Sequence, residues 1–282
     1  MSLENYQISL VLATKDRDIE LMNFLDHLQA QSYTNYELII VDQNTDDRVK
    51  NIVDKKPHLN ILYFHSAPGL SKARNVGLKH ASGEIIGFPD DDCWYDKNVL
   101  KKVNDFFGTH PEFEALAGKS TGETGGNLWK WDKQSGKIDK INVWKRANSN
   151  SIFTRFETIK KGISFNEKLG VGSGTSWGSG EEIDFLLQIL KKGGQIFYDP
   201  SFIVFHENSF PKGDNLAIKK AYSYASGMGY VLRINDYSMF VKLEYLARPF
   251  LNTIYSVLIG DIYLARFKWA MFRGRVHGML SK

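Results

Sequence analysis

The sequence is poor in cysteine and contains no long apolar run. Its 282 residues include a single cysteine, Cys93, so an internal disulfide is impossible, which fits a reducing compartment. No apolar stretch approaches the roughly 18 residues that a transmembrane helix needs. The N-terminal segment has no basic region before its apolar residues, so we expect a first strand there rather than a signal peptide. These absences predict a cytoplasmic protein.

A general excess of positive charge is also absent. The net charge is +4, but residues 242–282 carry seven Lys or Arg residues against two acidic residues, so this segment is +5 and the rest of the chain is −1. This distribution argues against nucleic acid as a partner and indicates a local partner for the C-terminal region. Two compatible interpretations remain open, namely helices packed against the main domain or an interfacial segment on an anionic membrane surface.

Strand-like and helix-like patterns alternate over the first hundred residues. Short apolar runs predict strands at residues 8–14, 36–42, 60–65 and 84–88. Helical spacing predicts helices at residues 19–30, 46–54, 70–81 and 96–107. Such alternation predicts an α/β fold with a mixed, mostly parallel central sheet flanked by helices, as in a Rossmann-like nucleotide-binding half.

The remainder of the chain is less regular. We expect an excursion or hairpin over residues 118–145, a strand at 148–154, a helix at 181–192 and a strand pair within 195–206, around Asp199-Pro200. Residues 170–180 are rich in glycine and predict a mobile loop. From about Ser209 the chain becomes helical, aromatic and basic, which predicts a C-terminal helical appendage.

Polar side chains follow each of the first four predicted strands. They lie at Thr14 to Arg17, at Asp42 to Asn44, at Gly69 to Asn75 and at Asp90 to Asp92. Ligands of open α/β sheets bind outside the carboxyl ends of the strands, so these groups should converge on one crevice. Such a mixture suits a nucleoside diphosphate, with Arg74 and Lys72 for phosphate oxygens, carboxylates for a divalent cation and Asp42 for a base edge.

The three adjacent aspartates Asp90, Asp91 and Asp92 leave two interpretations open. Like charges at this spacing repel, so either water solvates the cluster as a turn and helix cap, or a cation neutralises it.

The order and spacing of these segments resemble family 2 glycosyltransferases with the GT-A fold, of the bacterial surface-polysaccharide type. The matching stretches are ISLVLATKDR, Gln31-Ser32-Tyr33, YELIIVDQNTDD and GLSKARNVGLKHASGEIIGFPDDD, followed by WGSGEEIDFLLQILKKG and FIVFHE. The resemblance spans roughly residues 6–208. It implies a glycosyltransferase domain at 1–208, with a nucleotide-sugar-binding half at 1–118 and an acceptor-binding half at 119–208, and a basic aromatic region at 209–282.

The resemblance also implies roles on the donor side. Thr14, Arg17 and Asp42 would read the nucleotide base, and Arg74 would lie near the base and the diphosphate. Asp90, Asp91 and Asp92 match the family's D-x-D-type motif, in which Asp90 would approach the ribose and Asp92 would bind the metal, while Asp91 is the least assigned. His206 stands where many members place a histidine near the metal or the diphosphate. The implied cofactor is Mg²⁺ or Mn²⁺.

On the acceptor side, the family's Glu-Asp pair corresponds to Glu181-Glu182. The second member is the general base of the family, so Glu182 is the candidate, with Glu181 and Asp184 as alternatives. We expect Trp177, in the glycine-rich loop, to lie near the acceptor sugar.

The predicted function is therefore a metal-dependent inverting glycosyltransferase of the hexosyltransferase type. Its donor would be a nucleotide sugar, for which Asp42 favours UDP by resemblance, and its acceptor a hydroxyl of a glycan or lipid-linked saccharide in polysaccharide biosynthesis. The basic C-terminal region suggests a peripheral position at the inner face of the cell membrane. The alternatives are a sugar nucleotidyltransferase and an inactive module that binds a sugar or a partner.

Overall fold

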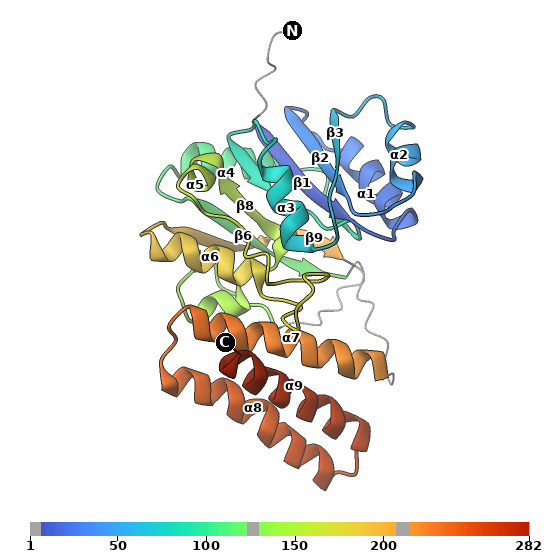
Figure 1. The fold of residues 1–282 in the computed structure, drawn as a ribbon. Coiled ribbons are helices and arrows are strands. Elements are labelled where there is room, and N and C mark those ends of the chain that lie inside the picture. Colours follow the sequence, from blue (N-terminus) through green and yellow to red (C-terminus); the bar gives the residue numbers. More distant parts are fainter. Residues whose placement is uncertain (1–6, 123–129, 207–214, 282) are drawn as a thin grey trace. The chain divides into compact units, whose positions relative to one another are not determined.

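The computed structural model describes residues 7–122, 130–206 and 215–281, which form two compact units (Figure 1). The first unit comprises the described parts of residues 1–68, 72–165 and 185–208. The second comprises residues 69–71 and 166–184 and the described part of residues 209–282. The domain boundaries predicted at residues 118 and 208 stay predictions.

A single mixed sheet forms the centre of the first unit. Its order over the described residues is β3-β2-β1-β4-β8-β6-β9-β5, with β7 paired to β9. The strands β1 to β4 are parallel, whereas β8 is antiparallel to both of its neighbours. The predicted mostly parallel sheet is therefore confirmed. The strands are β1 (Ile8–Thr14), β2 (Tyr36–Asp42), β3 (Ile61–His65), β4 (Ile85–Gly87), β5 (Cys93–Tyr95), β6 (Ala115–Thr121), β7 (Gly136–Lys137), β8 (Ile152–Arg155) and β9 (Ile196–His206).

Helices cover both faces of the parallel part of this sheet. The helices α1 (Ile19–Gln29) and α4 (Val99–Thr109) share one apolar core with alternate residues of β1 and β2, such as Leu10 and Leu38. On the other face, α3 (Leu70–Leu78) approaches so closely that a Cβ on Gly77 would lie 2.5 Å from Cγ1 of Val11. Because both faces are covered, every residue of β1 and β2 is buried.

Shorter elements complete the first unit and its connections. They are α2 (Arg48–Val53), α5 (Phe156–Lys160), α6 (Glu181–Lys191) and the two 3-10 turns η1 (Asn142–Lys145) and η2 (Ser149–Ser151).

The expected strand pair around Asp199-Pro200 is wrong, because the segment forms one strand, β9. The pairing register of β9 with β6 shifts between the pairs Ala117–Tyr198 and Lys119–Ile203. Pro200 lies inside this irregularity, where a missing N–H group interrupts no regular ladder hydrogen bond. Pro200 therefore marks an irregularity within one strand and not a turn between two strands.

Three long helices dominate the second unit, namely α7 (Asn215–Ile234), α8 (Met239–Leu258) and α9 (Ile262–Leu280). Asp261 caps α9 by accepting a 2.8 Å hydrogen bond from the backbone N–H of Leu264. The helices α7 and α9 lie in close contact at glycines: a Cβ on Gly274 would overlap the carbonyl oxygen of Tyr222, and one on Gly278 would overlap that of Ser226. The predicted C-terminal helical region is confirmed.

None of the helices within residues 7–122, 130–206 and 215–281 combines the length and the apolar character required to cross a membrane.

Candidate functional site

The carboxyl ends of β1, β2 and β4 bring the predicted donor-side residues together in the first unit. Thr14 and Asp42 are direct neighbours in the parallel register of β1 and β2. The segment after β4 turns back toward β1, where Asp90 forms an isolated parallel bridge with Ala13. This bridge places the three consecutive aspartates at the end of β1.

Asp90 faces Arg74, which is completely buried on α3. The guanidinium donates a 2.7 Å hydrogen bond from Nη2 to Oδ1 of Asp90, and it lies 5.2 Å from the centre of the Phe165 ring. Burial raises the pKa of Asp90, and the positive charge of Arg74 opposes that rise. A buried pair of this kind is costly to break, because removing one partner leaves an uncompensated charge.

Asp91 is held by the end of β1 and the residues after it. Oγ1 of Thr14 donates a 2.7 Å hydrogen bond to Oδ2, and Nη1 of Arg17 donates a 3.0 Å hydrogen bond to Oδ1. Burial raises the pKa of Asp91 to about 6, although Arg17 and Thr14 both favour its charged form. Asp91, the least assigned of the three from sequence, is thus the one that ties the aspartate turn to Thr14.

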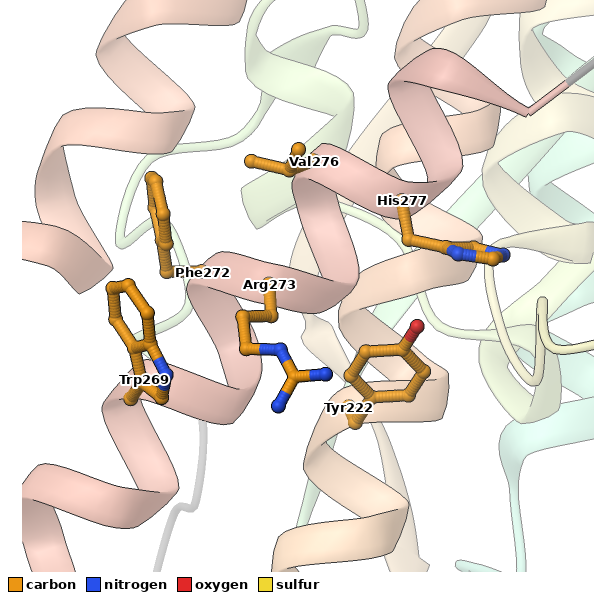
Figure 2. Close-up of a pocket in the computed structure, with 6 residues that line it drawn as sticks. All are labelled: Tyr222, Trp269, Phe272, Arg273, Val276 and His277. Carbon is orange, nitrogen blue, oxygen red and sulfur yellow. The ribbon is translucent and has the colours of Figure 1, made fainter.

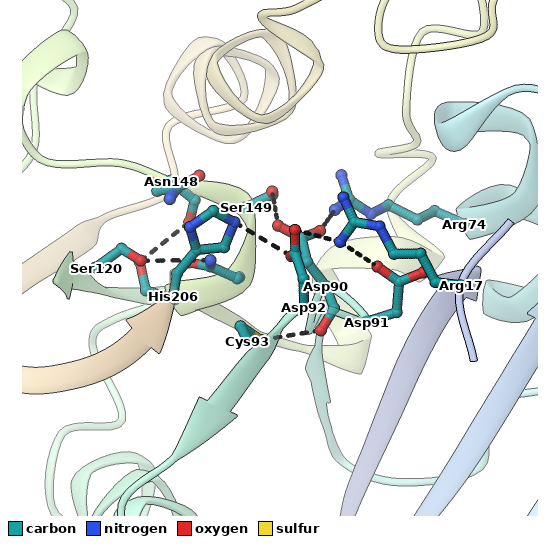
Figure 3. Close-up of polar contacts among 12 residues, drawn as sticks. Arg17, Arg74, Asp90, Asp91, Asp92, Cys93, Ser120, Asn148, Ser149 and His206 are labelled. Carbon is teal, nitrogen blue, oxygen red and sulfur yellow. Dashed lines mark hydrogen bonds and ion pairs between the residues drawn. The ribbon is translucent and has the colours of Figure 1, made fainter. Parts of the chain in front are cut away.

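Asp92 lies between a guanidinium and an imidazole (Figure 3). Its Oδ2 pairs with Arg17, and its Oδ1 lies 3.2 Å from Nε2 of His206 at the end of β9. Burial alone would raise the pKa of Asp92, but the hydrogen bond and charge of His206, together with Arg17, lower it to about 2. The hydrogen bond to Asp92 in turn raises the pKa of His206.

Each aspartate of the triplet therefore has a different set of partners. Three carboxylates face two guanidinium groups and one imidazole, so the chain itself relieves most of the repulsion between them. The cluster is therefore not a solvated surface turn. It is also not a site in which an external cation alone offsets the negative charge of the carboxylates.

Asp92 and His206 are the two neighbouring side chains of the described cluster that could bind a metal ion. Over residues 7–122, 130–206 and 215–281, no three His, Cys, Asp or Glu side chains are grouped as ligands of one ion. Asp92 and His206 are adjacent, and a carboxylate held ionised beside an imidazole suits Mn²⁺ or Mg²⁺. Mg²⁺ commonly takes only one or two protein ligands and completes its shell with phosphate oxygens and water. The two residues therefore fit a cation that binds together with a diphosphate.

Asp42 and Lys72 have different environments in the same unit. Asp42 is fully buried and accepts hydrogen bonds from Asn44 and from the hydroxyl of Tyr63 on β3. Lys72 is exposed on α3. Sequence reasoning did not find Tyr63, because the strand pattern that predicts β3 gives no sign of which neighbouring side chain it meets.

The acceptor-side candidates lie in the second unit, where α6 begins. Glu181 is buried, and its carboxylate lies so close to the preceding loop that a Cβ on Gly170 would come within 3.2 Å of Oε2. Asp184 is also buried and accepts a 2.9 Å hydrogen bond from Nδ2 of Asn235 on α7. Glu182 is the only one of the three predicted candidates that is partly exposed. A partly exposed residue is easier for a hydroxyl group to reach than a buried one.

Trp177 lies in the glycine-rich loop and stacks on Tyr230 of α7, with 3.6 Å between the ring centres. The same loop is held to the helices by a hydrogen bond from Gly178 N to the carbonyl of Ser223 and by a 3.0 Å contact between Ser176 Oγ and His277 Nε2. One face of the indole is covered by Tyr230. Contact of Trp177 with an acceptor stays a prediction.

Comparison with solved structures defines the class of this fold. A mannosyltransferase from Pyrobaculum calidifontis, solved with GDP-Man and Mn²⁺, matches with a TM-score of 0.65 over 99% of this chain and 89% of that chain, at 14% identity. S. aureus TarS 1–349, solved with UDP-GlcNAc, matches with a TM-score of 0.60 over 95% and 92%, at 17% identity. The fold is therefore that of the GT-A glycosyltransferases.

The family follows from the sequence. The model of glycosyl transferase family 2 matches residues 9–177, more than half of the chain, so this protein belongs to that family. One curated relative is the Escherichia coli UDP-Glc:alpha-D-GlcNAc-diphosphoundecaprenol beta-1,3-glucosyltransferase WfgD, 30% identical over 105 residues, which cover 36% of this chain and 42% of that protein. The chain spans 41, 42 and 58% of the length of three such relatives.

Proposed function

We propose that this protein transfers a sugar from a nucleoside-diphosphate donor to an acceptor hydroxyl, with inversion at the anomeric carbon. The observation that carries the proposal is the cluster of Asp90, Asp91 and Asp92 with Arg17, Arg74 and His206 at the strand ends of a family 2 chain. It joins anion-binding and cation-binding groups in one place, as a metal-bound diphosphate requires.

On the donor side, Asp42, Thr14 and Arg17 would contact the nucleotide base, and Asp90 the ribose. Arg74 and the exposed Lys72 would bind phosphate oxygens. Asp91 would hold the aspartate turn against Thr14, as its hydrogen bond indicates. Asp92 and His206 would hold Mg²⁺ or Mn²⁺, and such an ion supplies positive charge where the departing diphosphate becomes more negative.

On the acceptor side, Glu182 would act as the general base. The acceptor oxygen would form a bond to the anomeric carbon while the bond from that carbon to the diphosphate oxygen breaks. The hydroxyl proton would pass to the Glu182 carboxylate, which makes the oxygen a competent nucleophile. A single base opposite the leaving group gives inversion, in contrast to the two carboxylates that retaining glycosidases use.

For the acceptor we propose a glycan or a lipid-linked saccharide of polysaccharide assembly. The relative WfgD is named for a UDP-glucose donor and an acceptor linked to diphosphoundecaprenol. The basic C-terminal region of this chain would bring the enzyme to an anionic membrane surface, where such an acceptor lies.

Thermal unfolding in the presence of nucleotide sugars tests this function. A ligand that binds only the native state raises the apparent melting temperature, so we expect a rise with UDP-sugars that requires Mn²⁺. GDP-mannose serves as the comparison donor. If no nucleotide sugar shifts the melting temperature with or without Mn²⁺, and none is hydrolysed or transferred, the proposed activity is wrong.

A further inference from the structure

The outer face of α8 is apolar, although it faces solvent. Phe240, Leu243, Leu251, Ile254 and Leu258 recur at helical spacing, and all five are exposed; Phe240 and Leu258 are 78 and 79% exposed. The residues of α8 that are buried are Pro249 and Ser256. A helix of a soluble protein normally shows the opposite arrangement, with its apolar stripe toward the core.

The turn from α8 to α9 extends this apolar surface. Val257, Ile259 and Ile262 are each more than half exposed, and Gly260 between them has a φ of +76°, which forms the tight turn. Phe250 of α8 is also exposed and contacts Phe272 of α9, with 5.3 Å between the ring centres. Exposed apolar surface of this extent is rare on a soluble monomer and marks a surface that binds something.

The charges around this surface are mainly positive. Residues 239–281 contain six Lys or Arg residues and two acidic residues. Both acidic side chains are engaged, Glu244 with Arg248 and Asp261 as the cap of α9. None of the ion pairs found over the described residues includes Arg266, Lys268 or Arg273. Arg266 and Arg273 are exposed and Lys268 is half-buried, and Arg266 also donates a 3.3 Å hydrogen bond to Oδ1 of Asn215. The exposed charges can therefore meet an anionic partner.

A shallow pocket of about 340 Å³ lies beside this surface, on α7 and α9. Figure 2 shows the Arg273 side chain between the rings of Trp269 and Tyr222. The other residues that line the pocket are Phe272, Val276 and His277. A guanidinium flanked by aromatic rings suits a phosphate group at the boundary between water and acyl chains, where Trp and Tyr are also favoured.

We propose that α8 and the α8–α9 turn lie in the interface of an anionic phospholipid membrane. The apolar face of α8 would enter the boundary of headgroups and acyl chains by roughly 5–10 Å, while Arg266, Lys268 and Arg273 contact lipid phosphates. The charge favours lipid over a second copy of this chain, because two such surfaces would bring like charges together. The inference rests on the proposed function only in placing a lipid-linked acceptor near this surface.

Vesicle sedimentation of the full chain tests the proposal. We expect the protein to bind vesicles of phosphatidylcholine and phosphatidylglycerol in equal parts, and phosphatidylcholine vesicles much more weakly. The combined variant Phe240→Ser, Leu251→Ser, Leu258→Ser should bind the anionic vesicles at least about tenfold more weakly, because it removes apolar surface from the interface. Ile141→Ser changes an apolar residue of the first unit that is as exposed as Leu251, and it should bind like the wild type.

A second variant tests the charges. Arg266→Gln, Lys268→Gln, Arg273→Gln should lose about tenfold or more in binding to anionic vesicles at low salt and should leave weak binding to phosphatidylcholine unchanged. Circular dichroism of both combined variants should match the wild type, since the substituted side chains are exposed or half-buried.

Three outcomes would overturn the proposal. One is the absence of wild-type binding to anionic vesicles at low salt, and another is equal binding by the wild type and the triple serine variant. The third is a wild-type dimer, seen by analytical ultracentrifugation, that the serine variant dissociates, which would make the apolar face an interface between copies. Mn²⁺-dependent binding of UDP, measured on the same samples, reports separately on the proposed transferase function.

Discussion

The hydroxyl of Tyr63 donates a 2.6 Å hydrogen bond to Oδ2 of Asp42, across the neighbouring strands β3 and β2. Oδ1 of the same carboxylate accepts hydrogen bonds of 2.8 and 2.7 Å from the backbone and side-chain amides of Asn44. A carboxylate has about four acceptor positions, so three of them are used within the protein. Tyr63 and Asn44 thereby fix the direction in which Asp42 would accept a hydrogen bond from a base.

Tyr63→Phe should weaken the binding of UDP by roughly 3- to 10-fold, about the contribution of one hydrogen bond, and leave kcat nearly unchanged. The reason is that the Asp42 carboxylate loses one of the three donors that orient it. Isothermal titration calorimetry with UDP measures the effect.

Tyr33→Phe is the matched control, because the Tyr33 hydroxyl donates a 3.1 Å hydrogen bond to Asn104 elsewhere in the first unit. An equal loss of UDP affinity in both variants would mean that the effect is a general change in the fold, and no loss in Tyr63→Phe would remove Tyr63 from base recognition.

Removal of the metal ion should abolish transfer. We expect no activity in EDTA, recovery on addition of Mn²⁺, and a loss of roughly 10²-fold or more in Asp92→Asn at saturating Mn²⁺. The expectation follows from the pairing of the ionised Asp92 with His206. Steady-state kinetics over a range of Mn²⁺ concentrations makes the measurement.

Asp132→Asn provides the control for this series, since Asp132 pairs with Arg146 and lies outside the aspartate cluster. Full activity of the wild type in EDTA would contradict the assigned role of Asp92.

Glu182→Gln should lower kcat by roughly 10²- to 10⁴-fold, the usual contribution of a general base, without weakening the binding of the donor. The amide keeps the size of the side chain but cannot take the acceptor proton. Glu181→Gln and Asp184→Asn should act mainly on stability, because both carboxylates are buried.

Kinetics and donor binding, measured on all three variants, distinguish these roles. If Glu182→Gln turns over like the wild type while one of the other two loses kcat at unchanged melting temperature, the base is that other residue.

Asp91 should make the free energy of unfolding depend on pH. Its pKa is near 3.8 in the unfolded chain, and burial raises it to about 6 in the native state. The native state therefore binds more protons between these values, so this contribution is present below 3.8 and is lost as the pH rises through about 6. The loss is on the order of 3 kcal/mol at most, at about 1.4 kcal/mol per pKa unit.

Urea unfolding in EDTA across this pH range should show the decrease in the wild type and a flatter profile in Asp91→Asn. The opposite shift of Asp92 acts below 3.8, and the raised pKa of His206 acts above 6.5, so neither falls in the same window. The raised pKa of Asp90 also acts above 3.8, so Asp91→Asn should remove part of the decrease and not all of it. Asp105→Asn, on the exposed side of α4, should keep the wild-type profile. An unchanged slope in Asp91→Asn would contradict the assignment.

The sequence was sufficient for the strands and helices whose periodicity is local. The predicted strand at residues 8–14 and the predicted helix at 181–192 agree with β1 and α6 to within a residue. A short continuous apolar run marks the fully buried strand, and apolar residues at helical spacing mark the helix. The short strand β5 has three residues, too few to show any period, and was not predicted.

The sequence predicted which residues belong to the candidate site better than it predicted which of them contact one another. That Asp90, Asp91 and Asp92 follow a strand is a local fact, whereas their pairing with Arg74, Thr14 and His206 depends on residues up to 114 positions away. Likewise, the apolar periodicity of α8 predicts an amphipathic helix but not which way its apolar face points. That direction depends on the contact of Pro249 and Ser256 with the rest of the second unit.

The glycines between α7 and α9 fix the register of those two helices. Because a Cβ at Gly229, Gly274 or Gly278 would overlap the backbone of the opposite helix, a slip of one residue along α9 would drive a side chain into α7. The pair can therefore neither slide nor rotate in small steps. The contact of His277 with Ser176 joins this helix pair to the loop that precedes Glu181 and Glu182, so a change in the position of α9 would also alter the surroundings of that loop.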